Sequence, residues 1–264
     1  MPPFPPGTAW IGAEPPPTER ICATGPLLVH FIDVAHFSSV RTLPYLRGWA
    51  ERYGEHGLTV VAVNSPRFRF TAELGKLAAA VERLDLPFPV AADADYAAWH
   101  DYGCTGWPSL FLWGRGGALR WYHFGEGEYA GTEHAIQEEL GVGDGPHAPE
   151  PLPPLRPSDA PDGLVARPSQ EVFPGGSVSE PWEGAAPSGQ LELDYEAGGA
   201  WAAVDGSGTL TLSLDGGPAT AIEVTAPGAY ELAEHGRHGS HRLRLSASAG
   251  VSVYSIGFSA GIPA

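Results

Sequence analysis

Cysteine is scarce in this chain, because only Cys22 and Cys104 occur among 264 residues. Two cysteines cannot build the several bridges of a small disulfide-stapled protein, so that class is excluded. Long apolar runs are also missing, since no window approaches the roughly 18 residues that a membrane-spanning helix needs. The N-terminal segment has neither a basic start nor an apolar stretch, so we expect no secretory signal and a cytoplasmic location.

Positive charge is the second scarcity. The chain has 15 Lys and Arg residues against 31 Asp and Glu residues, a formal net charge of -16, and Lys76 is its only lysine. A phosphate backbone or an anionic lipid surface repels such a chain, so we expect no nucleic-acid partner and no membrane partner. Glycine and proline are abundant, with 35 and 27 residues, and they cluster between the periodic segments.

The order of strand-like and helix-like segments divides the chain into two parts. Residues 26–143 alternate apolar strand patterns with amphipathic helix patterns, which predicts an α/β fold with a mixed sheet. The later part has short alternating strands separated by Gly, Pro and Asp, which predicts an all-β sandwich. We therefore predict an α/β domain over residues 1–143, a proline-rich linker over 144–166 and a β-sandwich over 167–264.

One junction in the α/β part has an unusual composition. Residues 29–46 read VHFIDVAHFSSVRTLPYL: a buried-strand pattern, a short elbow and then a helix that contains Pro44. The elbow itself, residues 36–39, reads HFSS. A serine at this place is suited to begin the helix, because its hydroxyl can accept a hydrogen bond from an unpaired backbone N–H of the first turn.

Several segments of the chain resemble one known family. VRTLPYLRGWAERYGEHGLTVVAVNSP, DYAAWHDYG, GWPSLFLW and YHFGEGEY resemble the thioredoxin-like domain of DipZ-type and TlpA-type thiol-disulfide oxidoreductases. The β-rich tail resembles the carbohydrate-binding-module-like sandwich that follows this domain in DipZ-type proteins. The resemblance implies a thioredoxin-like α/β domain followed by an all-β sandwich of the jelly-roll type.

The same resemblance locates a redox site whose sulfurs are missing. Members of the family carry Cys-x-x-Cys at the end of the first core strand, and the matching positions here are His36 and Ser39. Neither side chain can form a disulfide, so both sulfurs needed for thiol exchange are lost. His30 stands where thioredoxins commonly carry a buried acid. By resemblance Pro108, after Trp107, is the cis-proline that flanks the site.

Two interpretations of the altered elbow need no chemistry. In the first, the elbow is inert and serves only as the start of a helix. In the second, the site keeps a binding surface, on which Trp107 and Pro108 dock an extended peptide or protein without reacting with it. The glycine-rich segment FGEGEY, residues 124–129, would shape one rim of that groove, and Glu126 is its candidate binding residue.

Three further interpretations make the site reactive. Ser39 could be a nucleophile, with His30 or His36 as its base and Asp33 to orient the base. His30, His36 and Cys104 could together hold a metal ion. Finally, Cys104 alone could support a thiol-disulfide oxidoreductase or a peroxidase-like enzyme, although a buried free cysteine is more often inert.

The β-rich part offers weaker candidates. Trp182 and Trp201 could stack on a sugar ring and so bind carbohydrate, or they could belong to the core. The segment EHGRHGSHRL places His235, His238 and His241 three residues apart, and its glycines predict a solvated hairpin turn. From all these features we expect a redox-inactive binding or scaffolding protein rather than an enzyme, with no cofactor and no bound metal.

Overall fold

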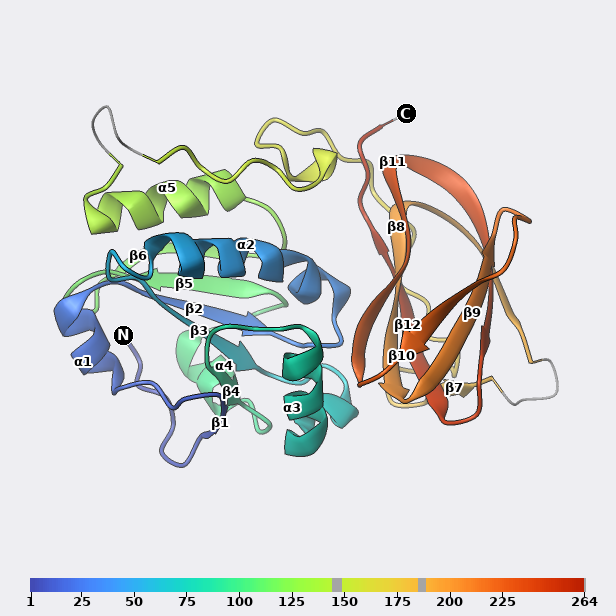
Figure 1. Cartoon of the computed structure of the whole chain (residues 1–264), viewed down its shortest axis with the longest axis horizontal. Coiled ribbons are helices and arrows are strands. Elements are labelled where there is room, and N and C mark those ends of the chain that lie inside the picture. The colour runs from blue at the N-terminus through green and yellow to red at the C-terminus, as the bar shows by residue number, and fades with distance from the viewer. Residues whose placement is uncertain (144–148, 185–188, 264) are drawn as a thin grey trace. The chain divides into compact units, whose positions relative to one another are not determined.

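The computed structural model describes residues 1–143, 149–184 and 189–263, and it separates into two compact units (Figure 1). The first unit comprises Met1–Asp33, Ser38–Arg67 and Ala72–Pro154; the second comprises Val34–Phe37, Phe68–Thr71 and Leu155–Ala264. The beginning of the predicted linker, residues 144–148, lies outside the described residues.

The first unit is built on a six-stranded mixed sheet with the strand order β1-β4-β3-β2-β5-β6. Strand β2 is parallel to β3, and β3 to β4, whereas the remaining neighbours are antiparallel. The strands are β1 (Ala9–Ile11), β2 (Leu27–Ile32), β3 (Thr59–Asn64), β4 (Val90–Ala92), β5 (Ser109–Trp113) and β6 (Leu119–Phe124). This arrangement confirms the predicted thioredoxin-like α/β fold.

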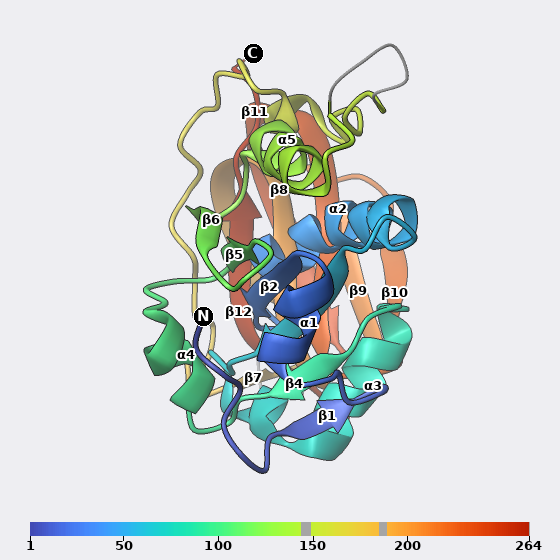
Figure 2. The same cartoon turned by 90° about the vertical axis from the view of Figure 1, so that its left-hand side faces the viewer.

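Helices cover both faces of this sheet, which explains why its central strands are continuous apolar runs. Helices α2 and α5 lie on one face, and α1 and α4 lie on the other (Figure 2). All six residues of β2 are buried. The helices are α1 (Thr18–Thr24), α2 (Phe37–Tyr53), α3 (Leu74–Arg83), α4 (Ala97–Tyr102) and α5 (Tyr129–Leu140), and 3₁₀ turns span Arg69–Ala72 and Pro157–Asp159.

A buried carboxylate joins α2, α5 and the chain that follows them. Glu133 on α5 accepts hydrogen bonds from Trp49 Nε1 at 3.0 Å, Arg52 Nη1 at 3.0 Å and the Tyr53 hydroxyl at 2.7 Å. It also accepts the backbone N–H of Leu152 at 2.7 Å. Four donors compensate the loss of hydration of this charge, so Glu133 holds Leu152 of the proline-rich segment within the first unit.

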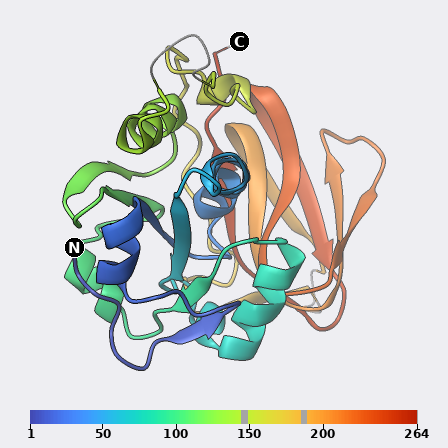
Figure 3. The same cartoon turned by 60° about the vertical axis from the view of Figure 1, so that its left-hand side comes forward.

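The second unit contains a six-stranded antiparallel sheet with the order β10-β9-β11-β8-β12-β7. The long strands β8 and β11 (orange to red in Figure 3) run through the whole sandwich. The strands are β7 (Trp182–Glu183), β8 (Leu191–Gly206), β9 (Gly208–Leu214), β10 (Thr220–Val224), β11 (Gly228–Ala247) and β12 (Val251–Ser259). The predicted all-β sandwich is confirmed, and its core includes Leu210 and Leu212, which alternate along β9.

The prediction of a hairpin turn around the three histidines is wrong. This segment lies within β11, whose pairing with β8 shifts between Glu234 and Gly239. The chain therefore bulges inside a continuing strand, because Gly236 adopts a positive φ without ending the pairing. His235 and His241 stack there, with ring centroids 3.6 Å apart.

Within the described ranges, no helix is both long enough and apolar enough to cross a membrane.

Candidate functional site

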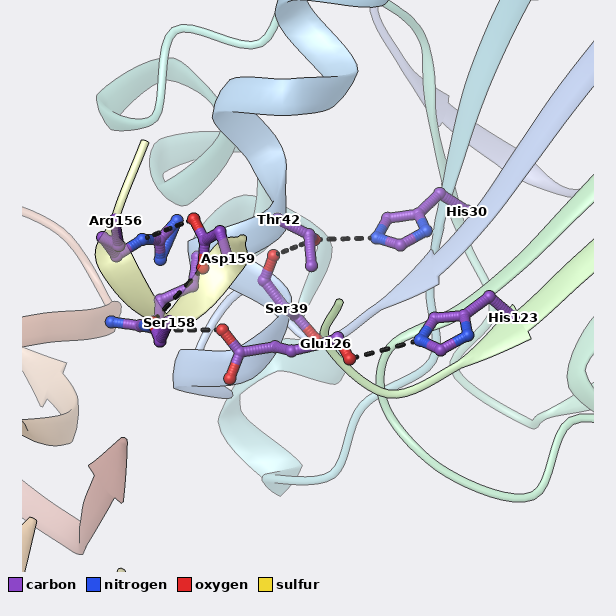
Figure 4. Close-up of polar contacts among 9 residues, drawn as sticks. His30, Ser39, Thr42, His123, Glu126, Arg156, Ser158 and Asp159 are labelled. Carbon is purple, nitrogen blue, oxygen red and sulfur yellow. Dashed lines mark hydrogen bonds and ion pairs between the residues drawn. The ribbon is translucent and has the colours of Figure 1, made fainter. Parts of the chain in front are cut away.

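His30 lies in the middle of β2, buried beneath the start of α2 (Figure 4). Its Nε2 is 2.8 Å from the Thr42 hydroxyl, and that hydroxyl is 2.6 Å from the carbonyl oxygen of Ser39. The Thr42 hydroxyl has a single proton, which it donates to the Ser39 carbonyl. His30 must therefore donate from Nε2, which identifies its neutral tautomer.

The environment of His30 keeps it uncharged. Burial and, to a smaller extent, the nearby His123 together lower the pKa of His30 from 6.5 to about 3. An efficient general base has a pKa close to the working pH. At neutral pH the imidazole of His30 is thus a hydrogen-bond donor to Thr42 rather than a base ready to accept a proton.

Ser39 lies in the first turn of α2 and its side chain is 0 % exposed. Its hydroxyl accepts a hydrogen bond from the backbone N–H of Asp33 at 3.2 Å. The Asp33 carboxylate in turn accepts the backbone N–H of Arg67 at 2.5 Å. These groups support the local backbone, and the structure does not bring Ser39 and His30 together as a nucleophile and its base, because His30 bonds to Thr42.

Phe37, the second residue of the elbow, packs within the second unit. Its ring lies nearly parallel to the Trp201 ring, with centroids 6.5 Å apart and planes inclined by 26°. A Cβ atom on Gly257 would come within 2.6 Å of the Phe37 ring, so the glycine leaves the space that the ring fills. The backbone N–H of Ala229 donates to the Val34 carbonyl at 3.0 Å. Val34 and Phe37 are thereby packing positions of the second unit.

His36 is half-buried immediately before α2, and its ring centroid is 5.5 Å from that of Phe37. His30 and Cys104 cannot share a metal ion, because they lie on opposite faces of the sheet: His30 faces α2, whereas Cys104 packs beside α1 and α4. In the part of the chain that the structure describes, no three His, Cys, Asp or Glu residues are grouped to hold a metal ion.

Both cysteines are buried and neither forms a disulfide. Burial raises the pKa of the Cys104 thiol to about 12, more than the neighbouring Ser109 hydrogen bond lowers it. Burial also raises the pKa of Cys22. The thiolate is the nucleophile in thiol exchange, so neither cysteine has the form that such chemistry requires at neutral pH.

The Trp107–Pro108 peptide bond is cis, as the resemblance implies. Trp107 is half-buried; its Nε1 donates to the Ser65 carbonyl at 2.7 Å, and its ring lies 4.4 Å from the Trp99 ring. Pro108 is buried, and its carbonyl accepts the backbone N–H of Gly125 at 2.8 Å. These contacts hold one wall of the predicted groove in a single arrangement.

Glu126 lies in the turn between β6 and α5, where its side chain accepts a hydrogen bond from Arg41 Nε at 2.6 Å. The His123 ring donates to the Glu126 carbonyl at 3.2 Å (Figure 4). Arg41 is buried on α2 and far from Glu126 in the sequence, so the sequence alone did not indicate this ion pair. The pair fixes the FGEGEY turn to the start of α2.

The two tryptophans proposed as sugar platforms belong to the interior of the second unit. Trp201 is 8 % exposed, and its ring faces Phe37. Trp182 is half-buried, packs against the sandwich core and pairs with Val253 on β12. The burial of Trp201 leaves its indole no open face on which a sugar ring could stack, whereas Trp182 stays partly exposed.

A mixed sheet with a cis-proline before β5, and an elbow between β2 and α2, defines a thioredoxin-like protein whose elbow lacks cysteine. Residues 178–259 match the family described as "Thioredoxin like C-terminal domain". Protein DipZ of Mycobacterium tuberculosis and Protein DipZ of Mycobacterium bovis are each 27% identical over an alignment of 264 positions that covers 87% of this chain. The chain is thus a DipZ-like thioredoxin-fold protein with a C-terminal β domain of that family.

Other similarities are narrower. NHL repeat-containing protein 2 of Bos taurus is 29% identical over 129 residues, 48% of this chain and 18% of that protein. The solved thiol-disulfide isomerase of Corynebacterium glutamicum is 18% identical with a TM-score of 0.46, over 50% of this chain and 90% of that one. The chain spans only 38% of the length of the two DipZ proteins.

Proposed function

We propose that this DipZ-like chain is redox-inactive and acts by binding a partner rather than by thiol exchange. The observation that carries the proposal is the state of its thiols. His36 and Ser39 occupy the positions of the redox pair, and the two cysteines that exist are buried and unpaired. Exchange requires an accessible thiolate to attack and a second sulfur to resolve the mixed disulfide, and the elbow supplies neither.

The contacts of the elbow support the same conclusion for the reactive alternatives. The Ser39 hydroxyl is bonded to the Asp33 backbone, and His30 is bonded to Thr42 with a pKa of about 3. A hydrolase built on Ser39 would need a base of suitable pKa within hydrogen-bond reach of its hydroxyl. The packing of Phe37 on Trp201 gives the elbow a structural purpose instead.

The partner that fits best is an extended peptide beside Pro108. Trp107 is half-exposed, and its hydrogen bond to Ser65 and its contact with Trp99 hold the indole rigidly. A rigid, partly exposed indole next to the start of a strand supplies apolar contact area at little entropic cost. Binding of this kind requires no sulfur.

Insulin reduction in the presence of dithiothreitol tests the redox part of the proposal. The wild-type chain and Cys104→Ser are compared with dithiothreitol alone, and we expect all three rates to agree. Turnover by the wild-type chain that disappears in Cys104→Ser would instead establish an oxidoreductase that works through Cys104. Labelling by a fluorophosphonate probe that disappears in Ser39→Ala would establish a hydrolase.

Peptide binding tests the second part. A library of extended peptides is screened against the wild-type chain, and the best peptide is titrated into Trp107→Ala and into Trp182→Ala as the matched control. We expect Trp107→Ala to weaken binding by about tenfold or more, since loss of a rigid aromatic anchor commonly costs over 1 kcal/mol. Equal weakening by both variants would place the peptide elsewhere.

A further inference from the structure

Strand β6 ends the sheet of the first unit (Figure 2). It pairs with β5 from Ser109↔Phe124 to Trp113↔Leu119, and no other described strand pairs with it. An edge strand presents backbone N–H and C=O groups on its open side, where another extended segment can pair with them. Protected edges in natural proteins are short, interrupted by proline or lined with charged side chains.

The side chains on one face of this edge strand are apolar instead. Leu119 is 44% exposed, Tyr122 57% and Phe124 40%. The register places them opposite Trp113, Phe111 and Ser109, on the face of the sheet that carries α1 and α4. The rings of Tyr122 and Phe124 lie 5.5 Å apart. We call these three residues the β6 strip.

The opposite face of β6 is already occupied. Trp121 donates from Nε1 to the Thr132 hydroxyl of α5 at 3.1 Å, and a Cβ on Gly131 would lie 3.4 Å from its ring. Arg120 pairs with Glu139 of α5 at 3.0 Å. Strand β6 is therefore held against α5 on one face. The β6 strip on the other face and the outer backbone edge remain accessible to a partner.

The local charge indicates what kind of partner fits. Residues 102–125 contain no aspartate or glutamate, although the whole chain has 31 of them, and this segment carries Arg115 and Arg120. Arg120 is half-exposed despite its ion pair. A second copy of the chain would bring the same basic segment, with Arg115 and Arg120, against itself. An acidic segment, by contrast, would meet opposite charge at this edge.

We propose that β6 is a docking edge for an extended acidic peptide segment of a partner protein. The segment adds a seventh strand to the sheet by backbone hydrogen bonds with β6. Its apolar side chains, which alternate along the strand, cover the β6 strip, and its carboxylates lie toward Arg115 and Arg120. This inference goes beyond the groove at Pro108, because it requires neither Trp107 nor the elbow.

Binding of two synthetic peptides to the full chain tests this proposal. One peptide alternates glutamate with valine, and the other alternates lysine with valine; titration calorimetry is done at low and at high salt. We expect the glutamate peptide to bind at least about fivefold more tightly at low salt, with an affinity that falls as salt is added. Equal binding of the two peptides, or no binding of either, would overturn the proposal.

Variants of the β6 strip locate the site. Tyr122→Thr keeps a good strand former and removes the most exposed ring, so we expect it to weaken binding about threefold or more. Phe124→Thr should act in the same direction, whereas Leu164→Ser, at an 80% exposed leucine of the second unit, should change nothing. Circular dichroism confirms that each variant is folded.

Two outcomes of the variant series would contradict the inference. Folded Tyr122→Thr and Phe124→Thr that both bind like the wild-type chain would place the peptide elsewhere. Self-association of the wild-type chain that is lost in Tyr122→Thr, without peptide binding, would show that a second copy occupies the edge. If Tyr122→Thr loses binding while Trp107→Ala still binds the peptide, the β6 edge is a site distinct from the proposed groove at Pro108.

Discussion

Protonation of His30 should destabilise the first unit as the pH falls. The folded-state pKa of His30 is about 3, because burial removes the hydration that an imidazolium needs, whereas the pKa of an exposed histidine is 6.5. The unfolded chain therefore binds a proton between these two values and the folded chain does not. The stabilisation by neutral His30 is complete above pH 6.5, and it is lost progressively as the pH falls toward 3.

The size of this loss follows from the difference between the two pKa values. Each pKa unit corresponds to about 1.4 kcal/mol, so the His30 contribution to the free energy of unfolding falls by about 2 kcal/mol between pH 7 and pH 5. Near pH 3 the loss is about 4 kcal/mol. A loss of about 2 kcal/mol is a substantial part of the stability of an ordinary domain.

Urea unfolding at pH 7 and pH 5 measures the effect, and native-state hydrogen exchange of the β2 amides reports on the first unit separately. His30→Gln keeps a donor for Thr42 but cannot be protonated, so its stability should fall by about 2 kcal/mol less than that of the wild-type chain. His56→Gln, at an exposed position, should behave like the wild-type chain. Equal losses in His30→Gln and the wild-type chain would refute the reasoning.

Three other predictions concern packing and reactivity. Iodoacetamide should modify Cys104 in the folded chain about 10³-fold more slowly than a free cysteine, because a pKa of about 12 leaves little thiolate at neutral pH. A rate in the folded chain within tenfold of the rate in the unfolded chain would contradict this prediction. Glu133→Ala should reduce the free energy of unfolding by about 3–5 kcal/mol, because four donors lose their acceptor. Glu138→Ala, at an exposed position of the same helix, should cost under about 0.5 kcal/mol. Similar losses in the two variants would show that the hydrogen bonds of Glu133 do not stabilise the first unit. Gly257→Ala should lower the free energy of unfolding by about 1–3 kcal/mol, measured by thermal unfolding, because the new methyl group meets the Phe37 ring. The loss should be smaller in a chain that also carries Phe37→Ala. An equal loss in both backgrounds would argue against the contact.

The sequence predicted the parts of the fold whose hydrophobic period is strong. The continuous apolar run at residues 27–32 became β2, and the alternating leucines at 210 and 212 became core positions of β9. Strand β1 and helix α1 were not predicted, because their short segments lie among prolines and carry little periodic signal. The turn predicted near His238 was wrong, because glycines with positive φ also occur in bulges.

The candidate site could be located from the sequence but its contacts could not. The resemblance identified His36, Ser39 and Pro108, since these depend on spacing along the chain. The stacking of Phe37 on Trp201 joins distant positions and leaves no local pattern. The tautomer of His30 depends on which group accepts the single proton of the Thr42 hydroxyl, and only the hydrogen-bond geometry reveals that.

We propose that this chain keeps the thioredoxin-like scaffold and lacks exchange chemistry because the two sulfurs of the redox pair are missing. The most direct measurement is insulin reduction by His36→Cys/Ser39→Cys, with the wild-type chain and the single variant Ser39→Cys as controls. We predict that the double variant forms an internal disulfide and catalyses reduction above the dithiothreitol background, whereas both controls do not. A folded double variant that forms no disulfide and shows no turnover would contradict the claim, because it would mean that the scaffold had lost more than sulfur.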